Sequence, residues 1–153
     1  MILPIKIQNL IKKAAVNFNP SIFKSEIHGY KHSLNVMLYS GFLGYKENLT
    51  VAEIKILLEC AKYHDVGRIN DNEDLLHGMQ SADYIKDFQI KNKGMVLEII
   101  KNHCLPYCEI ENINDLHLKK LIYIFKDADA LDRIRFNDLD KNKLSTKTAK
   151  DYV

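Results

Sequence analysis

The chain has 153 residues, enough for one domain with its own core, and its 46% hydrophobic and 27% charged residues exclude a disordered or fibrous protein. The formal net charge is only +2 and the basic residues are spread along the chain, which argues against duplex DNA as a partner. The three cysteines, an odd number, and the lack of a secretory or membrane-spanning apolar run predict free thiols in a reducing cytoplasm.

The spacing of apolar residues predicts helices along the whole chain. Proline, glycine and capping residues mark their ends. Thr50 and Glu53, for example, have the S/T-x-x-E spacing of a capping box. The expected helices cover about residues 5–18, 28–44, 51–63, 75–85, 94–102 and 115–135. They form one domain over residues 1–136, and residues 137–153 are expected to be a polar, lysine-rich and partly mobile tail.

The run A-K-Y-H-D-V-G-R at residues 61–68 concentrates chemically active side chains at the end of an apolar helix. His64 and Asp65 offer an imidazole and a carboxylate, a pair that suits Mn, Fe, Co, Ni or Zn. A capping or surface role would also explain the pair. We expect Gly67 to let the backbone turn away. Arg68 is a candidate for binding a substrate phosphate, and a salt bridge to the acidic loop at Asp71 or Asp74 explains it equally well.

Four other histidines are candidate ligands. His28 is expected in the entry turn of its helix, four residues before His32, which lies inside it. One of these two could be a metal ligand, and a histidine that donates hydrogen bonds at a helix start explains His28 equally well. His77 begins a helix, and His103 ends one just before Leu105-Pro106. Both could be ligands of a shared site, and for either alone a hydrogen-bonded, non-ligand histidine is the simpler interpretation.

The run K-D-A-D-A-L-D-R at residues 126–133 places three carboxylates beside core positions. Such groups are costly to bury unless they are paired or bind a cation, and a solvated face paired with arginines is the alternative. Asp129 lies one turn after Phe125, at the edge of the apolar stripe. Asp127 is two residues away, about 200° around the helix, so we expect it to point outward or at most to pair with a lysine or arginine.

Taken together, I-H-G-Y-K-H-S-L-N-V at 27–36, the K-Y-H-D-V-G-R run and the K-D-A-D-A-L-D-R run resemble the HD-domain superfamily of metal-dependent phosphohydrolases. The resemblance covers roughly residues 27–135. It implies an all-α, single-domain bundle of about five to seven helices and a metal site. The implied metal ligands are His32, His64, Asp65 and Asp129, with His77 and His103 as further ligands where two ions are bound.

The sequence departs from parts of the superfamily at two positions. Cys104 follows His103 where some members have a second histidine, which weakens the case for a second ion. Asn35 stands where an arginine is common. The chain also lacks the G-Y-P signature of the cyclic di-GMP phosphodiesterase branch, so that substrate is not implied. Cys104 and Cys108 are interpreted as free thiols, because no second thiol pair completes a structural zinc site.

The resemblance implies hydrolysis of a small phosphate ester, such as a nucleotide, with Asp65 and Arg68 as catalytic residues. One divalent ion, and a second where His77 and His103 bind, would be Mn, Fe, Ni, Co, Mg or Zn and would activate water. Two alternatives are a nucleotide-binding regulatory module without turnover and a nuclease acting on single strands. The lack of a basic, aromatic-rich groove argues against the nuclease. The substrate, the native metal and the oligomeric state cannot be determined from the sequence.

Overall fold

The computed structural model describes residues 2–16, 18–72 and 74–153, so residues 1, 17 and 73, in the expected N-terminal helical region and the acidic loop, are outside it. All regular elements in these ranges are helical, which confirms the all-α prediction. The α-helices are α1 (Ile5–Val16), α2 (Tyr30–Lys46), α3 (Val51–Tyr63), α4 (His77–Ile85), α5 (Lys93–Asn102), α6 (Tyr107–Glu111), α7 (Leu116–Leu131) and α8 (Lys147–Tyr152). Short 3-10 turns cover Pro20–Ile22, Asp132–Phe136 and Lys141–Lys143.

The described residues form eight α-helices, more than the five to seven expected. The two that the sequence did not reveal, α6 and α8, have only five and six residues, too few for a clear apolar repeat. The long helix predicted to reach Arg135 ends at Leu131, and the chain continues as a tighter 3-10 turn. Within the described ranges, no helix is both long and apolar enough to cross a membrane.

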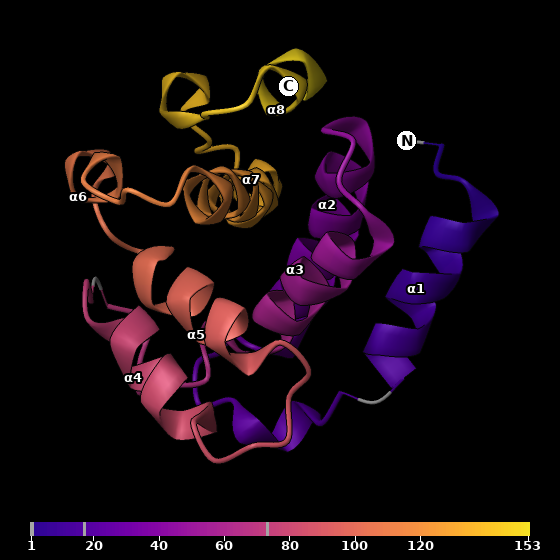
Figure 1. The fold of residues 1–153 in the computed structure, drawn as a ribbon. Coiled ribbons are helices and arrows are strands. Elements are labelled where there is room, and N and C mark those ends of the chain that lie inside the picture. The colour runs from indigo at the N-terminus through magenta and orange to yellow at the C-terminus, as the bar shows by residue number, and fades with distance from the viewer. Residues whose placement is uncertain (1, 17, 73) are drawn as a thin grey trace.

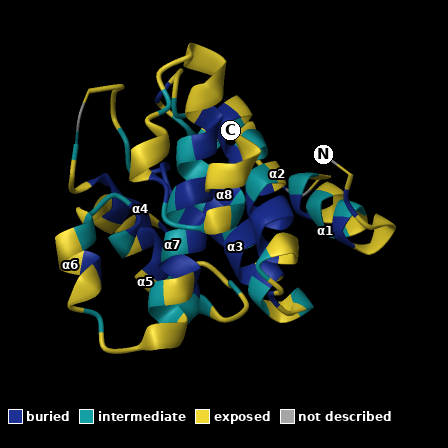
Figure 2. Ribbon diagram, turned by 90° about the horizontal axis from the view of Figure 1, so that it is seen from above, coloured by how far each residue is buried: buried dark blue, intermediate teal, exposed yellow. Residues whose placement is uncertain are grey.

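Four central helices enclose the core. α2 and α3 lie side by side, α7 packs against both, and α5 packs against α3 and α7 (Figure 1). α4 covers the outer side of α5, and α1 lies against α2 and α3. Buried residues concentrate where the central helices face one another (Figure 2). The largest fully buried side chains include Met37, Leu43, Ile54, Leu57, Ile99, Ile100, Leu121 and Phe125.

The N-terminus of α3 carries the predicted capping box. The Thr50 hydroxyl accepts a hydrogen bond from the Glu53 amide at 3.3 Å, and the Glu53 carboxylate accepts one from the Thr50 amide at 2.6 Å. An N-cap of this kind stabilises a protein by about 1 kcal/mol. The helix then runs to Tyr63, so the His-Asp pair follows directly after its last residue.

Gly67 has a different role from the one expected. No glycine in the described ranges has a positive φ, so the turn after the His-Asp pair does not require glycine for its backbone angles. A Cβ atom at Gly67 would instead lie 2.4 Å from the amide nitrogen of Ser81. Glycine is needed because α4 packs directly on this turn, where the Gly67 amide donates to the Ser81 hydroxyl at 2.9 Å.

The segment after residue 136, expected to be partly mobile, folds back onto the bundle. Leu144 and Ala149 are buried, and α8 packs against α2 and α7. Asp127 accepts hydrogen bonds from the backbone amides of Ser145 at 2.8 Å and Thr146 at 2.6 Å. Asp127 is therefore fully buried, and the expectation that it points outward is wrong. The physical reason is that the amides leading into α8 need an acceptor.

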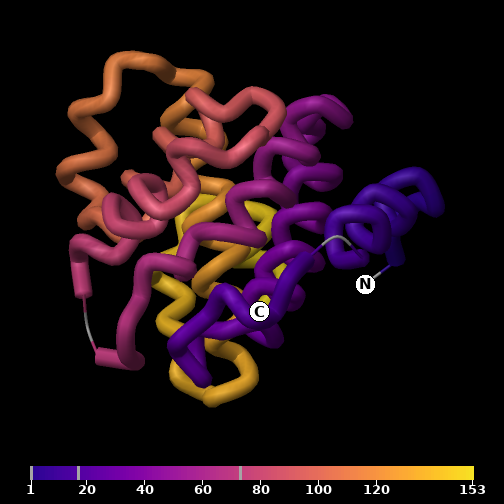
Figure 3. Tube along the Cα trace, turned by 90° about the horizontal axis from the view of Figure 1, so that it is seen from below, coloured from indigo at the N-terminus to yellow at the C-terminus, as the bar shows by residue number. Residues whose placement is uncertain are grey.

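Segments distant in sequence meet on the face seen from below. The connection between α1 and α2 lies beside the turn that follows α7 (Figure 3). Arg135 links the two by donating a hydrogen bond to the carbonyl of Ile27 at 2.7 Å. This contact forms one wall of the cavity described next.

Candidate metal centre

Asp65 lies at the centre of a buried cluster assembled from five helices or their ends. His64 and Asp65 follow α3, and both are buried. Each carboxylate oxygen of Asp65 faces a different group of imidazoles. The six predicted ligands are all brought together here: His32 from α2, His64 and Asp65 after α3, His77 from α4, His103 after α5 and Asp129 from α7.

On one side, which we call the carboxylate side, the Oδ2 atom of Asp65 faces the Nε2 atoms of His64 at 3.2 Å and His32 at 3.3 Å. Asp129 closes this side, with its Oδ1 atom 3.1 Å from His32 Nε2 and 3.6 Å from His64 Nε2. His28 approaches Oδ2 of Asp65 from the cavity at 3.5 Å. Five side chains thus converge within about the span of one ion and its ligands.

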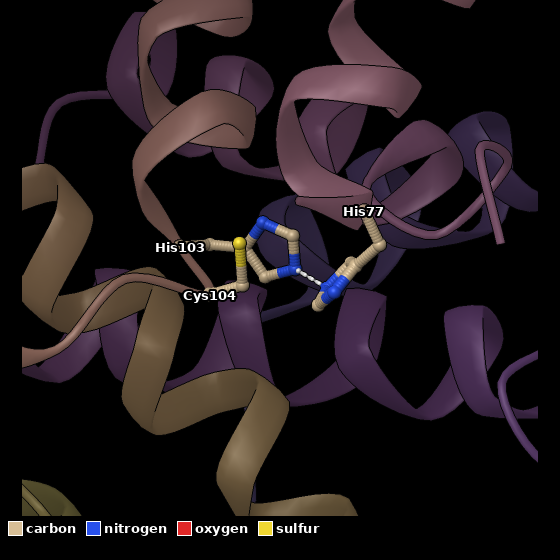
Figure 4. A group of neighbouring side chains, drawn as sticks. All are labelled: His77, His103 and Cys104. Atoms are coloured by element: carbon tan, nitrogen blue, oxygen red, sulfur yellow. Dashed lines mark hydrogen bonds between the residues drawn. The ribbon is translucent and has the colours of Figure 1, made fainter. Parts of the chain in front are cut away.

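On the other side, which we call the imidazole side, the Oδ1 atom of Asp65 lies 3.3 Å from His77 Nε2 and 4.0 Å from His103 Nε2. The two Nε2 atoms are 2.9 Å apart (Figure 4). Arg68 Nε donates to the same Oδ1 atom at 2.9 Å, and the Arg68 Nη2 atom lies 3.5 Å from His77 Nε2. Among the residues that the structure describes, this side has no carboxylate beyond Asp65, and Arg68 already pairs with that one.

Hydrogen bonds at Nδ1 orient the buried rings. Nδ1 of His64 lies 3.2 Å from the Ala61 carbonyl, that of His103 lies 2.6 Å from the Ile100 carbonyl, and that of His77 bonds the Asp74 carbonyl. A carbonyl only accepts, so each Nδ1 carries the hydrogen and each Nε2 presents its lone pair when the ring is neutral. Anchoring of this kind is typical of histidines that bind metal ions.

Asp132 anchors the His32 ring. Its Oδ2 atom lies 2.7 Å from His32 Nδ1, and its Oδ1 atom accepts from Asn35 at 2.7 Å. Burial opposes the charge on Asp132, but hydrogen bonds from His32, Asn35 and Arg135 hold its pKa below the usual range. The sequence pattern had indicated no role for Asp132. Its position three residues after Asp129 was the available signal, since that spacing keeps both on one face of a helix.

The carboxylate side attracts positive charge. Burial lowers the pKa values of His32 and His64, but the neighbouring aspartates outweigh the effect of burial. The pKa of His32 is raised well above its usual range, and the pKa of His64 is raised to about 9. Burial likewise raises the pKa values of Asp65 and Asp129, and the histidines overcome this and hold both well below the ordinary value. A divalent ion could supply the same positive charge and displace the protons.

The imidazole side has the opposite electrostatic character. Burial lowers the pKa of His103 to about 3, and charge on His64 and His77 acts in the same direction. Burial also lowers the pKa of His77. Both rings are therefore neutral near pH 7, with their Nδ1 hydrogens bonded to carbonyls.

Arg68 does not form the salt bridge to Asp71 or Asp74 that the sequence left open. Its side chain pairs with Asp65 and donates to the Asn72 carbonyl at 3.1 Å. Asp71 instead accepts hydrogen bonds from the Ser25 hydroxyl and the Ile27 amide. Arg68 therefore lies beside the cluster, where it also lines a cavity.

The residues present fit a divalent ion. Several sets of three described residues have one potential ligand atom each within 4.8 Å of the others, among them His32 with His64 and Asp129, and His64 with Asp65 and His103. Imidazole and carboxylate donors together suit a first-row transition metal. The carboxylate side combines two neutral imidazoles with two carboxylates, so it can balance the charge of one such ion.

The fold and the cluster together define the class of protein: an all-helical domain built around a buried cluster of histidines and aspartates. A family model described as the HD domain matches residues 29–134, about two thirds of the chain. The chain belongs to the HD-domain family. Members of this family generally bind divalent metal ions and are hydrolases of the metal-dependent phosphohydrolase superfamily. Neither the curated proteins nor the solved structures give a significant match to the chain.

Proposed function

We propose that this protein is a metal-dependent phosphohydrolase that cleaves a small phosphate ester, with nucleotides as the substrate class, in the reducing cytoplasm. One observation carries the proposal. The buried ligand cluster opens into a cavity that arginines also line. A site of this composition offers both ligands for a metal ion and donors for a phosphate.

The cavity has a volume of about 450 Å³, within the range of small-molecule sites. His32, Asp65 and Asp129 line it, together with Arg133 and Arg135. The side chain of Asp129 is one-third exposed, at 32%, whereas that of Asp65 is 3% exposed. Asp129 is thus the predicted ligand most open to the cavity.

The arginines that line the cavity supply donors for an anion. Arg133 pairs with the exposed Asp138, and exposed pairs of this kind contribute at most about 1 kcal/mol. A phosphate can therefore replace Asp138 at small cost. Guanidinium groups bind phosphate through two parallel hydrogen bonds, which makes Arg133 the first candidate for this contact.

An aromatic face next to these donors favours a nucleotide over a simple sugar phosphate. The guanidinium carbon of Arg135 lies 3.8 Å from the centre of the Phe136 ring, and Phe136 is half-exposed on the cavity wall. A nucleobase can stack on a ring presented in this way. Stacking and phosphate binding would then use adjacent residues.

When bound, the ion supplies Lewis acidity and lowers the pKa of water next to it. Asp65 and Asp129 hold the ion with His32 and His64, and Asp132 keeps the His32 ring in place. Arg68 and Arg133 orient the phosphate. His28 lines the cavity and, at 24%, is the most exposed histidine of the cluster, so it is placed to pass a proton to the leaving oxygen.

The test is a panel of substrates with Mn or Ni added: a bis-aryl phosphodiester, nucleotides and short single-stranded DNA. We expect metal-dependent turnover of a nucleotide or of the diester, and its loss in Asp129→Asn. The matched control is Asp87→Asn, an exposed carboxylate in the turn that follows α4. Nucleotide binding without turnover would replace the proposal by a regulatory module, and cleavage of the DNA alone would replace it by a nuclease.

A further inference from the structure

The imidazole side ends at a cysteine that the chemistry above does not use. His77, His103 and Cys104 each offer a ring nitrogen or sulfur within 4.8 Å of the other two. Figure 4 shows the Cys104 sulfur beside the His103 ring, with His77 opposite. His77 begins α4 and the other two follow α5, so the group joins two helices that pack together.

A second observation points to a cation at this place. The side chains of His77 and His103 are 7% and 1% exposed, and their Nε2 atoms face each other at 2.9 Å. Since both Nδ1 hydrogens are bonded to carbonyls, two neutral rings would leave two lone pairs facing each other with no hydrogen between them. Buried polar atoms without a partner are costly, and an ion that accepts both lone pairs removes the cost.

The backbone is shaped to bring the sulfur close. A Cβ atom at Gly78 would lie 3.0 Å from the Cys104 sulfur and 2.5 Å from the Ile100 carbonyl oxygen. Only glycine lets the start of α4 approach the end of α5 this closely. The sulfur lies 3.2 Å from the Leu75 carbonyl and is half-buried, whereas Cys108 on α6 is exposed.

Charge balance explains why a thiolate suits this position. The carboxylate side has Asp129 in addition to Asp65, whereas the described part of the imidazole side offers only the Asp65 oxygen that Arg68 already contacts. Two neutral imidazoles and one shared carboxylate would leave a divalent ion there undercompensated. A thiolate would add the missing negative charge, and sulfur with imidazole favours Zn or Co over Mn or Mg.

We propose that Cys104 binds a second divalent ion as a thiolate together with His77 and His103, and that this site selects Zn or Co while the carboxylate side accepts Mn. The inference rests on the proposed metal centre and assigns its second ligand set. On binding, the Cys104 S–H bond is replaced by a sulfur–metal bond and the proton is released to solvent, with no change in oxidation state.

The first experiment follows cobalt binding by absorption spectroscopy. The expected result is a sulfur-to-cobalt charge-transfer band that develops with the second equivalent, persists in Cys108→Ser and disappears in Cys104→Ser. The Cys104→Ser variant should also bind the second equivalent at least about 10-fold more weakly, the lower end of the cost of outer-shell changes. A band that survives in Cys104→Ser, or two bound equivalents without a band, would overturn the assignment.

The second experiment does not depend on how Cys104→Ser folds. In Cys108→Ser, Cys104 is the accessible thiol because Cys60 is fully buried. Zinc should slow its reaction with a thiol reagent, because a metal-bound thiolate is no longer the free nucleophile, and Mn should leave the rate unchanged. If two zinc ions bind and the reaction rate of the Cys104 thiol is unchanged, the assignment of Cys104 is refuted but the proposed function is not. Protein that binds no ion on either side refutes the proposed function as well.

Discussion

Both sides of Asp65 contain buried histidines, but the charged groups beside those histidines differ. On the carboxylate side, neighbouring aspartates outweigh burial and raise the pKa values of His32 and His64, so positive charge is favoured there. On the imidazole side, burial lowers the pKa values of His77 and His103, and Arg68 shares the Asp65 carboxylate oxygen. Histidines alone therefore do not set the charge that a side favours, because the anions beside them do.

Asp65→Ala should have the largest effect because this residue belongs to both sides. We expect loss of both ions and of phosphohydrolase activity by far more than the roughly 10- to 100-fold cost of outer-shell changes. The helical fold should remain, which circular dichroism can check. Wild-type activity in metal-supplemented buffer would show that neither side needs Asp65.

The next largest effect separates two neighbouring carboxylates of α7. Asp129→Asn should weaken metal binding by 10-fold to 100-fold or more, since Asp129 is a predicted ligand and even outer-shell changes cost about that much. Asp127→Asn should leave the metal affinity nearly unchanged but lower the melting temperature, because it weakens the acceptor for the Ser145 and Thr146 amides. The opposite ranking would move the ligand to Asp127.

Asp132→Asn should affect only the carboxylate side. Since it positions the His32 ring without reaching the site, we expect about a 10- to 100-fold loss of affinity for the first ion and no change at the second. Titration with Mn, followed by titration with Zn, distinguishes the two. Equal losses for both ions would mean that the sides are not independent.

Thr50→Ala provides the smallest effect and separates stability from binding. Removal of this cap on α3 should lower the free energy of unfolding by about 1 kcal/mol and leave both metal affinities unchanged. The Thr50 hydrogen bond lowers the pKa of Glu53 below its ordinary 4.5, so the interaction is complete above that value and is lost as pH falls through the lower, folded value. Urea unfolding at pH 7 and in acid should therefore show a difference that shrinks in acid.

The sequence predicted what depends on local spacing. The capping box and the end of α3 were correct because each involves residues within one or two turns, and the helical rotation between Asp127 and Asp129 separates their directions as expected. Which atoms bind a metal stays a prediction.

The features that were missed depend on distant partners. Asp132 meets His32 across 100 positions of sequence, and Asp127 meets amides in a segment that looked like a polar tail. Two short helices were missed for the same reason, since their burial is set by the bundle rather than by their own pattern. No local rule contains that information.

Asp127, Asp129 and Asp132 lie on α7 and the turn that continues it, and this has a consequence for how the protein can vary. One inserted residue in a helix turns everything after it by about 100°. An insertion between Phe125 and Asp127 would move all three carboxylates away from their partners at once. Asp127 would lose the C-terminal segment, Asp129 the cluster and Asp132 the His32 ring. Length changes in natural variants should therefore be confined to the connections before Leu116 and after Phe136, and α7 should keep a constant length.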